Sequence, residues 1–191
     1  MKPAPKSSLT VGSGQKQAQR AILNLAMRRA GVLTISDRCA AGEAEDVSGQ
    51  VLEDALREAG YEVVRRAIVP DERALIAGWL RDACDTCDLI LTTGGTGFAP
   101  RDVTPEATRE VLEREAPGIA ELLRLEGLKK TPFAALSRGV AGIRGRTLII
   151  NLPGSPRAVR EGLEVLLPLL PHAIELILEQ PTSHSPQGGT T

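Results

Sequence analysis

Five consecutive small residues stand out as a group that could bind phosphate. They follow an apolar run and are Thr93, Gly94, Gly95, Thr96 and Gly97. Glycine tolerates positive φ and lets a ligand approach the backbone closely, so successive N–H groups can form a concave nest for phosphate oxygens. Threonine hydroxyls add further donors. A tight turn that holds no ligand is the alternative interpretation of the glycines alone.

Two aspartates are placed to hold a divalent cation near these glycines. Asp71 follows a predicted strand, and Asp102 comes shortly after the glycines, next to Arg101. Mg²⁺ in proteins is usually held by one or two carboxylates together with phosphate oxygens of the substrate. The alternatives are that Asp71 caps the helix that follows it and that Asp102 is a solvated loop charge. The two interpretations of Asp71 do not exclude each other.

Several further polar side chains could contact a substrate. They are Ser36, Arg38, Asp46, Ser48, Ser137 and Arg138. Taken singly, such residues are more often turn, cap or surface residues than ligand contacts. Among the arginines, Arg38, Arg101 and Arg138 are the candidates for bidentate phosphate binding. Arg101 is the strongest of the three because it lies beside the glycines.

Other familiar motifs are missing or weak. The chain contains neither G-x-x-x-x-G-K-[ST] nor a G-x-G-x-x-G that opens a helix, so a nucleotide would have to bind in another way. Cys84 and Cys87 have the spacing of a redox or zinc pair, but they end a predicted helix, which favours structural cysteines. His172 and His184 have no nucleophile partner in the pattern, and we assign neither to catalysis.

Charge and composition narrow the classes of partner. Residues 1–29 hold six basic side chains and no acid, whereas the rest of the 191 residues hold 17 basic and 24 acidic side chains. An acidic body does not attract nucleic acid through its overall field, and four aromatic residues leave little for base stacking. No apolar run approaches the roughly 18 residues of a membrane span. We therefore expect neither nucleic acid nor a membrane as a partner.

Strands and helices alternate along the body of the chain, which predicts an α/β fold, a three-layer αβα domain with a mainly parallel sheet. Apolar runs typical of buried strands occupy residues 31–35, 61–69, 88–93 and 146–152. Apolar residues at helical spacing predict helices over 48–59, 71–83 and 117–128, one from 104 and a long one from 156. We expect Thr104 to cap its helix, and Pro168 and Pro171 to bend the last one.

The expected sheet brings the polar segments together. Ligands of parallel sheets bind beyond the carboxyl ends of the strands. The segments that follow the predicted strands are 36–38, 70–71, 92–102 and 151–156. All four should lie at one edge of the sheet, and this convergence predicts a site there.

Composition divides the chain into a body and two tails. Residues 1–28, rich in Ser, Gly, Gln and Lys, predict a disordered basic extension, with a targeting segment as the alternative. Residues 29–179 form the expected domain, and residues 180–191 predict a disordered tail. Three cysteines and no secretory signal near Met1 favour a reducing compartment, so we expect a cytoplasmic protein.

Six segments occur in a distinctive order and spacing, namely Leu33–Arg38, Ile68–Asp71, Thr92–Gly97, Arg101–Ala107, Leu136–Arg138 and Leu148–Gly154. Together they resemble the molybdopterin adenylyltransferase family of the Mog type, which includes the G domains of plant and animal two-domain molybdenum-cofactor proteins. No single segment is decisive, but the ordered set is highly specific and covers about residues 30–178.

The resemblance implies the molybdenum cofactor biosynthesis protein fold, usually in a homotrimer, and a defined reaction. The terminal phosphate of molybdopterin attacks the α-phosphate of ATP with Mg²⁺ present, which gives adenylyl-molybdopterin and pyrophosphate. A downstream protein would then insert molybdate. The family's two functional aspartates fall on Asp71 and Asp102, and its phosphate-binding turn falls on residues 94–97 with Thr93 beside it. Its pterin contacts map to Ser36, Asp46, Ser48 and Ser137.

Two other functions are compatible with parts of the pattern. Relatives of the MoaB type share the fold and the glycine turn, and some would bind pterin without adenylylating it. The segment Arg101–Ala107 favours the Mog-type branch. A non-enzymatic binding or scaffold module is the other alternative, and the chain shows no long linker or second domain that would recruit partners.

Overall fold

A six-stranded sheet forms the middle layer of the computed structural model, which describes residues 28–178. Its order is β2-β1-β3-β6-β5-β4. The strands are β1 (Arg29–Ile35), β2 (Glu62–Val69), β3 (Leu89–Thr93), β4 (Arg114–Glu115), β5 (Ala141–Arg144) and β6 (Thr147–Leu152). The first four in spatial order are parallel, whereas β5 and β4 are antiparallel to their neighbours. The predicted mainly parallel sheet is confirmed.

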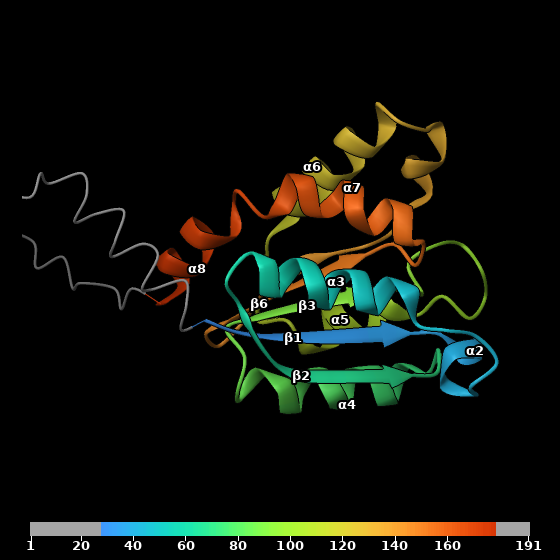
Figure 1. Cartoon of the computed structure of the whole chain (residues 1–191), viewed down its shortest axis with the longest axis horizontal. Helices are drawn as coiled ribbons and strands as arrows, with labels where there is room; N and C mark the ends of the chain where they lie inside the picture. The colour runs from blue at the N-terminus through green and yellow to red at the C-terminus, as the bar shows by residue number, and fades with distance from the viewer. Residues whose placement is uncertain (1–27, 179–191) are drawn as a thin grey trace, which may run out of the picture.

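Helices cover both faces of the sheet (Figure 1). One face carries α3 (Val47–Glu58), α6 (Pro117–Leu128), α7 (Pro156–Leu166) and α8 (Leu170–Leu178). The other carries α4 (Arg73–Cys84) and α5 (Thr104–Val111). Two short elements, α2 (Asp37–Ala40) and the 3₁₀ helix η1 (Pro132–Leu136), follow β1 and α6. This is the three-layer αβα arrangement that the sequence predicts.

Alternation along the strands explains the two cores. In β1, Ala30 and Val32 point into the cluster under α3 and α7, whereas Leu33 and Ile35 point into the cluster under α4 and α5. Opposite faces of a strand alternate with a period of two, and burial on both faces requires a continuous apolar run. Both cores are mainly aliphatic. Each fully buried Leu or Ile contributes about 1.5–3 kcal/mol to the stability of the fold.

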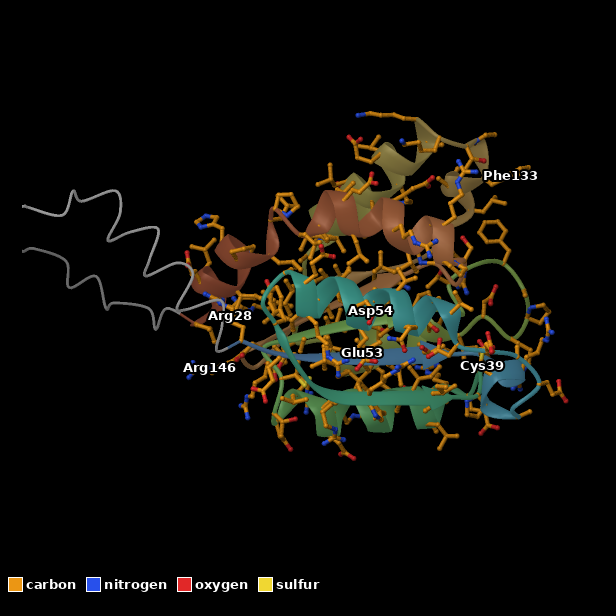
Figure 2. The ribbon with its side chains drawn as sticks, viewed as in Figure 1. Arg28, Cys39, Glu53, Asp54, Phe133 and Arg146 are labelled. Carbon is orange, nitrogen blue, oxygen red and sulfur yellow. The ribbon has the colours of Figure 1, made fainter. Side chains whose placement is uncertain are left out.

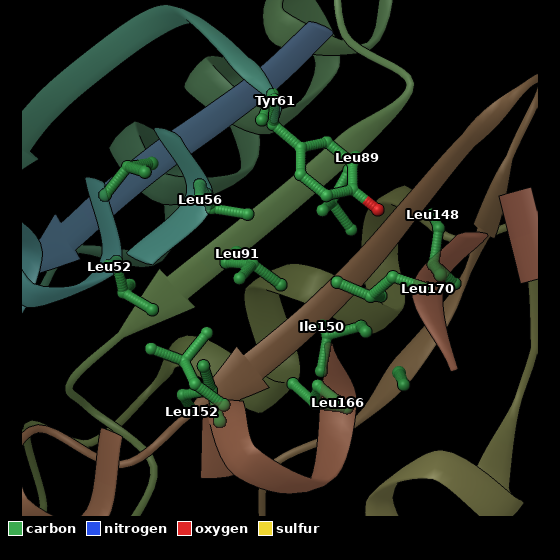
Figure 3. Packing of buried hydrophobic residues seen from close by; sticks show 14 of the residues in the cluster. Leu52, Leu56, Tyr61, Leu89, Leu91, Leu148, Ile150, Leu152, Leu166 and Leu170 are labelled. Carbon is green, nitrogen blue, oxygen red and sulfur yellow. The ribbon is translucent and has the colours of Figure 1, made fainter. Parts of the chain in front are cut away.

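Tyr61 is the one aromatic residue in the larger cluster, where it packs beside Leu89 (Figure 3). Arg28, the first described residue, lies on the opposite side of the molecule from the carboxyl ends of the parallel strands, near Arg146 in the turn between β5 and β6 (Figure 2). Arg28, which the sequence places in the extension, is 5% exposed and pairs with Glu175 of α8. The other residues of both predicted tails, and residue 179, lie outside the described residues.

Two local predictions and one alternative interpretation are wrong. Thr104 begins α5 without capping it, because its buried hydroxyl donates to the carbonyl of Gly94 instead. Asp71 is not the N-cap of α4; that position belongs to Glu72, which makes no side-chain cap. The two prolines of the last helix interrupt it, so that α7 and α8 are separate helices.

No helix among residues 28–178 is long and apolar enough to cross a membrane.

Candidate active site at the carboxyl edge of the sheet

The order of the strands creates a switch point between β1 and β3. The chain leaves β1 for β2 on one side and reaches β3 on the other, and such reversals open a crevice at the carboxyl ends of parallel strands. The strand ends are level, because Ile35 pairs with Val69, and Thr93 pairs with both Thr34 and Leu152. The four predicted polar segments therefore meet at one edge, as expected.

The glycine turn after β3 is held in a conformation that only glycine adopts readily. Gly94 and Gly95 have φ values of 101° and 62°, and a Cβ on Gly94 would lie 2.1 Å from the carbonyl oxygen of Ile35. Thr93 Oγ1 donates to Pro153 O at 2.8 Å, and Thr104 Oγ1 donates to Gly94 O at 2.9 Å. Neighbouring segments thus fix both sides of the turn.

The amides of this turn are available to a ligand. Gly94 N donates to Leu152 O, but the N–H groups of Gly95, Thr96 and Gly97 make no hydrogen bond within residues 28–178. Successive free amides around residues with positive φ form an anion-binding nest. The turn therefore has the geometry that the phosphate hypothesis requires.

Asp71 and Asp102 both lie against this turn. A Cβ placed on Gly95 would be 2.8 Å from Asp71 Oδ1, and one placed on Gly97 would be 2.9 Å from Asp102 Oδ2. Burial raises the pKa of Asp71, and the negative charges of Asp37 and Asp102 raise it further. The pair therefore repels itself when ionised, and a cation between the carboxylates would relieve that repulsion.

Asp37 joins the ends of β1 and β2. Its N–H donates to Asp71 Oδ2, and Asp71 N donates to Asp37 Oδ1, both at 3.0 Å. Arg101 grips the same carboxylate with two bonds of 2.9 and 2.7 Å. This pairing with Arg101 holds the pKa of Asp37 below its ordinary value. The bidentate grip predicted for Arg101 is therefore present, but its partner in this structure is a carboxylate of the chain.

The other two candidate arginines for phosphate binding are Arg138 and Arg38. Arg138 is occupied by the chain itself: it donates to Gly97 O and Asp102 O and pairs with Glu106. Arg38 lies exposed in α2 and does not line the pocket that opens beside the glycine turn. Isolated arginines in a sequence do not reveal which acceptors the fold will bring to them.

A pocket of about 620 Å³ opens beside the glycine turn. Its polar wall contains five of the predicted site residues, namely Gly95, Thr96, Gly97, Asp102 and Ser137. The opposite wall is mostly apolar and comes from α6, η1 and α7, with Leu123, Phe133 and Val165 among its residues. Phe133 is 75% exposed and projects from η1 (Figure 2). A cavity with one apolar wall and one wall of free amides suits a ligand that combines a planar ring with phosphate.

Three predicted pterin contacts lie outside this pocket, at the starts of α2 and α3. Ser36 caps α2 by accepting from Cys39 N. Asp46 caps α3 by accepting from Gly49 N, and it also accepts from Thr34 Oγ1 and Arg66. Ser48 is buried in the first turn of α3. Ser36 and Asp46 thus have structural partners already, whereas Ser137 is the predicted pterin contact that lines the pocket.

Comparison with known proteins gives the family. Residues 31–172 match the family model described as a probable molybdopterin binding domain. The chain belongs to this family. It is 49% identical to the molybdopterin adenylyltransferase of Helicobacter pylori J99 over 152 residues, which cover 78% of the chain and 86% of that protein.

Two further proteins are similar to the chain. The chain is 53% identical over 151 residues, 77% of its length, to the Drosophila melanogaster molybdenum cofactor synthesis protein cinnamon, of which it covers only 25%. The crystal structure of the molybdopterin biosynthesis enzyme MoaB from Thermus thermophilus is 57% identical, with a TM-score of 0.76, and the match covers 81% of this chain and 99% of that one. The fold and the family resemblance expected from the sequence are both confirmed.

Sequence reasoning missed some residues that build the site in this molybdopterin-binding domain. Asp37 stands out in the sequence only as part of a polar segment, although its position after a strand is the same signal that singles out Asp71. Arg124 and Lys130 line the pocket, but single basic residues on a helix look like surface positions in a sequence. Asn151 also lines the pocket, and it is 3% exposed.

Proposed function

We infer that this chain is a molybdopterin adenylyltransferase that acts in molybdenum cofactor biosynthesis. A terminal phosphate oxygen of molybdopterin forms a bond to the α-phosphorus of ATP, the bond from that phosphorus to the β-phosphate oxygen breaks, and pyrophosphate leaves. The observation that carries this conclusion is the match to the Helicobacter pylori enzyme of that name over 86% of its length. Both substrates, ATP and molybdopterin, follow from that activity.

The chain's own groups suit this reaction. Two polyanions must be held together, and the free amides of Gly95, Thr96 and Gly97 would bind phosphate oxygens without needing a positively charged side chain. The attacking phosphate is already an anion, so no general base has to remove a proton from it. Catalysis then depends on positioning and on stabilising charge in the transition state.

We propose Asp71 and Asp102 as the residues that hold Mg²⁺. No group of three or more His, Cys, Asp or Glu side chains among residues 28–178 could form a complete metal cage. Two carboxylates against a phosphate nest fit Mg²⁺ well, because this ion usually takes one or two carboxylates and completes its shell with water and substrate oxygens. When bound, the ion would neutralise phosphate charge. The carboxylates themselves orient towards the turn through Asp37 and Ala99 N.

Pterin contacts are proposed at Ser36, Asp46, Ser48 and Ser137. Ser137 lines the pocket and lies next to Arg138, whose N–H donates to Thr96 O. The other three lie at the end of β1 and at the start of α3, outside this pocket. A substrate that contacts both groups would have to reach beyond the pocket. Thr93 supports the turn through Pro153 and would not need to touch the ligand itself.

The test is pyrophosphate release in a mixture of the protein, molybdopterin, ATP and Mg²⁺. We expect release only when molybdopterin is present. Asp71→Asn and Asp102→Asn should fold, as judged by circular dichroism, but lose roughly 10²-fold or more in kcat, since stabilisation of transition-state charge is commonly of that size. Tight molybdopterin binding without pyrophosphate release would instead indicate the pterin-binding function of a MoaB-type relative. Release that persists in either variant would remove that aspartate from the site.

We also propose that the chain assembles as a homotrimer. Exposed apolar side chains gather on α6 and η1, where Leu125, Leu128, Phe133 and Leu136 are each between 45% and 75% exposed. Such side chains are often covered in an assembly. Sedimentation equilibrium should give three times the mass of one chain. A monomer at micromolar concentration would contradict this expectation.

A further inference from the structure

Arg138 lies under the loop that carries Asp102. Its Nε donates to Gly97 O at 2.7 Å, and its Nη2 donates to Asp102 O at 2.6 Å. These two carbonyls are the first and last of residues 97–102. One planar guanidinium therefore closes the base of a six-residue loop, in the fixed geometry that only arginine offers.

Two more contacts fix the position of Arg138. Nη1 pairs with Glu106 in the first turn of α5; burial alone would raise the pKa of Glu106, but its own N–H and the pairing with Arg138 together lower it. The main-chain N–H of Arg138 donates to Thr96 O at 2.9 Å, one residue before the loop. The side chain is 34% exposed, so these bonds are only partly open to competition from water. Arg138 thus connects α5, the glycine turn and the segment that enters β5.

Apart from its bonds to Arg138, the loop has one long-range polar contact in the part of the chain that the structure describes, which joins the exposed side chains of Arg101 and Asp37. Within residues 97–102, Ala99 N donates to Asp102 Oδ2 and Asp102 N donates to Ala99 O, which are both local bonds. Arg101 donates to Asp37, which lies outside the loop. Phe98, Ala99 and Pro100 are exposed. Without Arg138, the carbonyls at both ends of the loop would lose their long-range partner, and Asp102 would be free to shift.

We propose that Arg138 is a positioning residue for adenylyl transfer, which holds Asp102 and the amides of the glycine turn in their reactive arrangement and does not itself bind phosphate. This proposal rests on the proposed function. All three guanidinium nitrogens already donate to the chain, and Glu106 neutralises the charge. A phosphate ligand of Arg138 would have to displace these bonds.

The test compares Arg138→Met, Arg138→Lys and a matched control, Arg144→Met. Arg144 is also half-buried and donates to a carbonyl of α5, that of Val111, but it does not line the pocket beside the glycine turn. We measure kcat and KM for ATP from pyrophosphate release, and hydrogen–deuterium exchange in the peptide that covers residues 96–102. Arg138→Met should lower kcat about 10²-fold, the effect expected of a misplacement of about 1 Å, with little change in KM. Exchange in the loop should rise.

Arg138→Lys keeps the charge but can reach only one of the two carbonyls, so it should restore part of kcat and part of the exchange protection. If Arg138→Met does not fold, the lysine variant carries the test through the same two measurements. A rise in KM for ATP with kcat and loop exchange unchanged would show a direct phosphate contact and overturn the proposal. Equal losses in Arg144→Met would overturn it as well. Failure of the proposed function is distinct, because the wild-type protein would then release no pyrophosphate while loop exchange still responded to Arg138→Met.

Discussion

Asp71 presents one of its two carboxylate oxygens to the glycine turn because Asp37 occupies the other. Asp71 Oδ2 accepts from Asp37 N, which leaves Oδ1 near Gly95. Asp37 remains ionised, since Arg101 lowers its pKa. The two aspartates therefore have different roles. Asp37 is hydrogen-bonded to other residues of the chain, and Asp71 has an oxygen free for a cation. A sequence shows both residues after strands but cannot show this division.

Tyr61 offers a prediction at the scale of one residue. It is 4% exposed, and burial raises its pKa from 10 to about 12. The unfolded chain loses this proton near pH 10 and the folded chain near pH 12, so stability falls as the pH rises from 10 to 12. A difference of this size corresponds to about 2–3 kcal/mol. Urea unfolding at pH 9 and pH 11 should show about half of this loss in the wild type and none of it in Tyr61→Phe.

The hydroxyl of Tyr61 makes no hydrogen bond within residues 28–178. Tyr61→Phe should therefore match or exceed the wild-type stability at pH 9, because a buried hydroxyl without a partner costs free energy. An equal alkaline loss in both proteins would assign the effect to other groups.

At the scale of elements, the side chain of Asn151 in β6 links this strand to β3, to α5 and to the segment that leads into β5. Its Nδ2 donates to Thr92 Oγ1 in β3 and to Thr108 Oγ1 in α5, both at 3.0 Å, and its Oδ1 accepts from Val140 N at 3.2 Å. Every polar group of the amide is thus satisfied inside the core. A complete network of this kind specifies one arrangement of β3, β6 and α5 beneath the glycine turn.

Loss of the Asn151 amide should be expensive. Asn151→Ala leaves two buried hydroxyls and one N–H without their partner, which we expect to lower the free energy of unfolding by about 3–5 kcal/mol, because each unsatisfied buried group costs about 1–3 kcal/mol. Chemical denaturation measures the change. A triple variant combines Asn151→Leu with Thr92→Val and Thr108→Val. It should recover part of the stability that Asn151→Ala loses, because apolar side chains need no hydrogen bond. A triple variant less stable than Asn151→Ala would contradict the network.

The elements that the sequence predicts well are those with a clear apolar period. Helix α6 runs over residues 117–128 as expected, and β3 and β6 are within one residue of their predicted starts. Strands β4 and β5 were missed, because Arg114–Glu115 is too short for a period and Ala141–Arg144 contains glycine and arginine. The role expected of Thr104 is wrong because a cap and a buried hydroxyl at a helix start look alike in a sequence. Long-range acceptors, such as the two carbonyls that Arg138 contacts, leave no local pattern.

At the scale of the whole molecule, both cores and all the proposed site residues lie within residues 28–178. The final helix of this body, α8, buries Leu170 and Ile174 against the larger core, and Glu175 pairs with Arg28, which directly precedes β1. The two ends of the described body are therefore joined, although α8 and β1 lie far apart in the sequence.

A chain trimmed to residues 28–178 should keep the Tm and the kcat of the full chain, because it retains every contact described above. The matched control is a chain that ends at residue 168 and so lacks α8. Exposing the surface that Leu170 and Ile174 cover should lower the free energy of unfolding by about 3–6 kcal/mol, since each buried side chain of this kind contributes about 1.5–3 kcal/mol. Calorimetry and pyrophosphate release measure both effects. A large loss of activity in the 28–178 chain, with its Tm unchanged, would show that residues 1–27 or 179–191 contribute to the site directly.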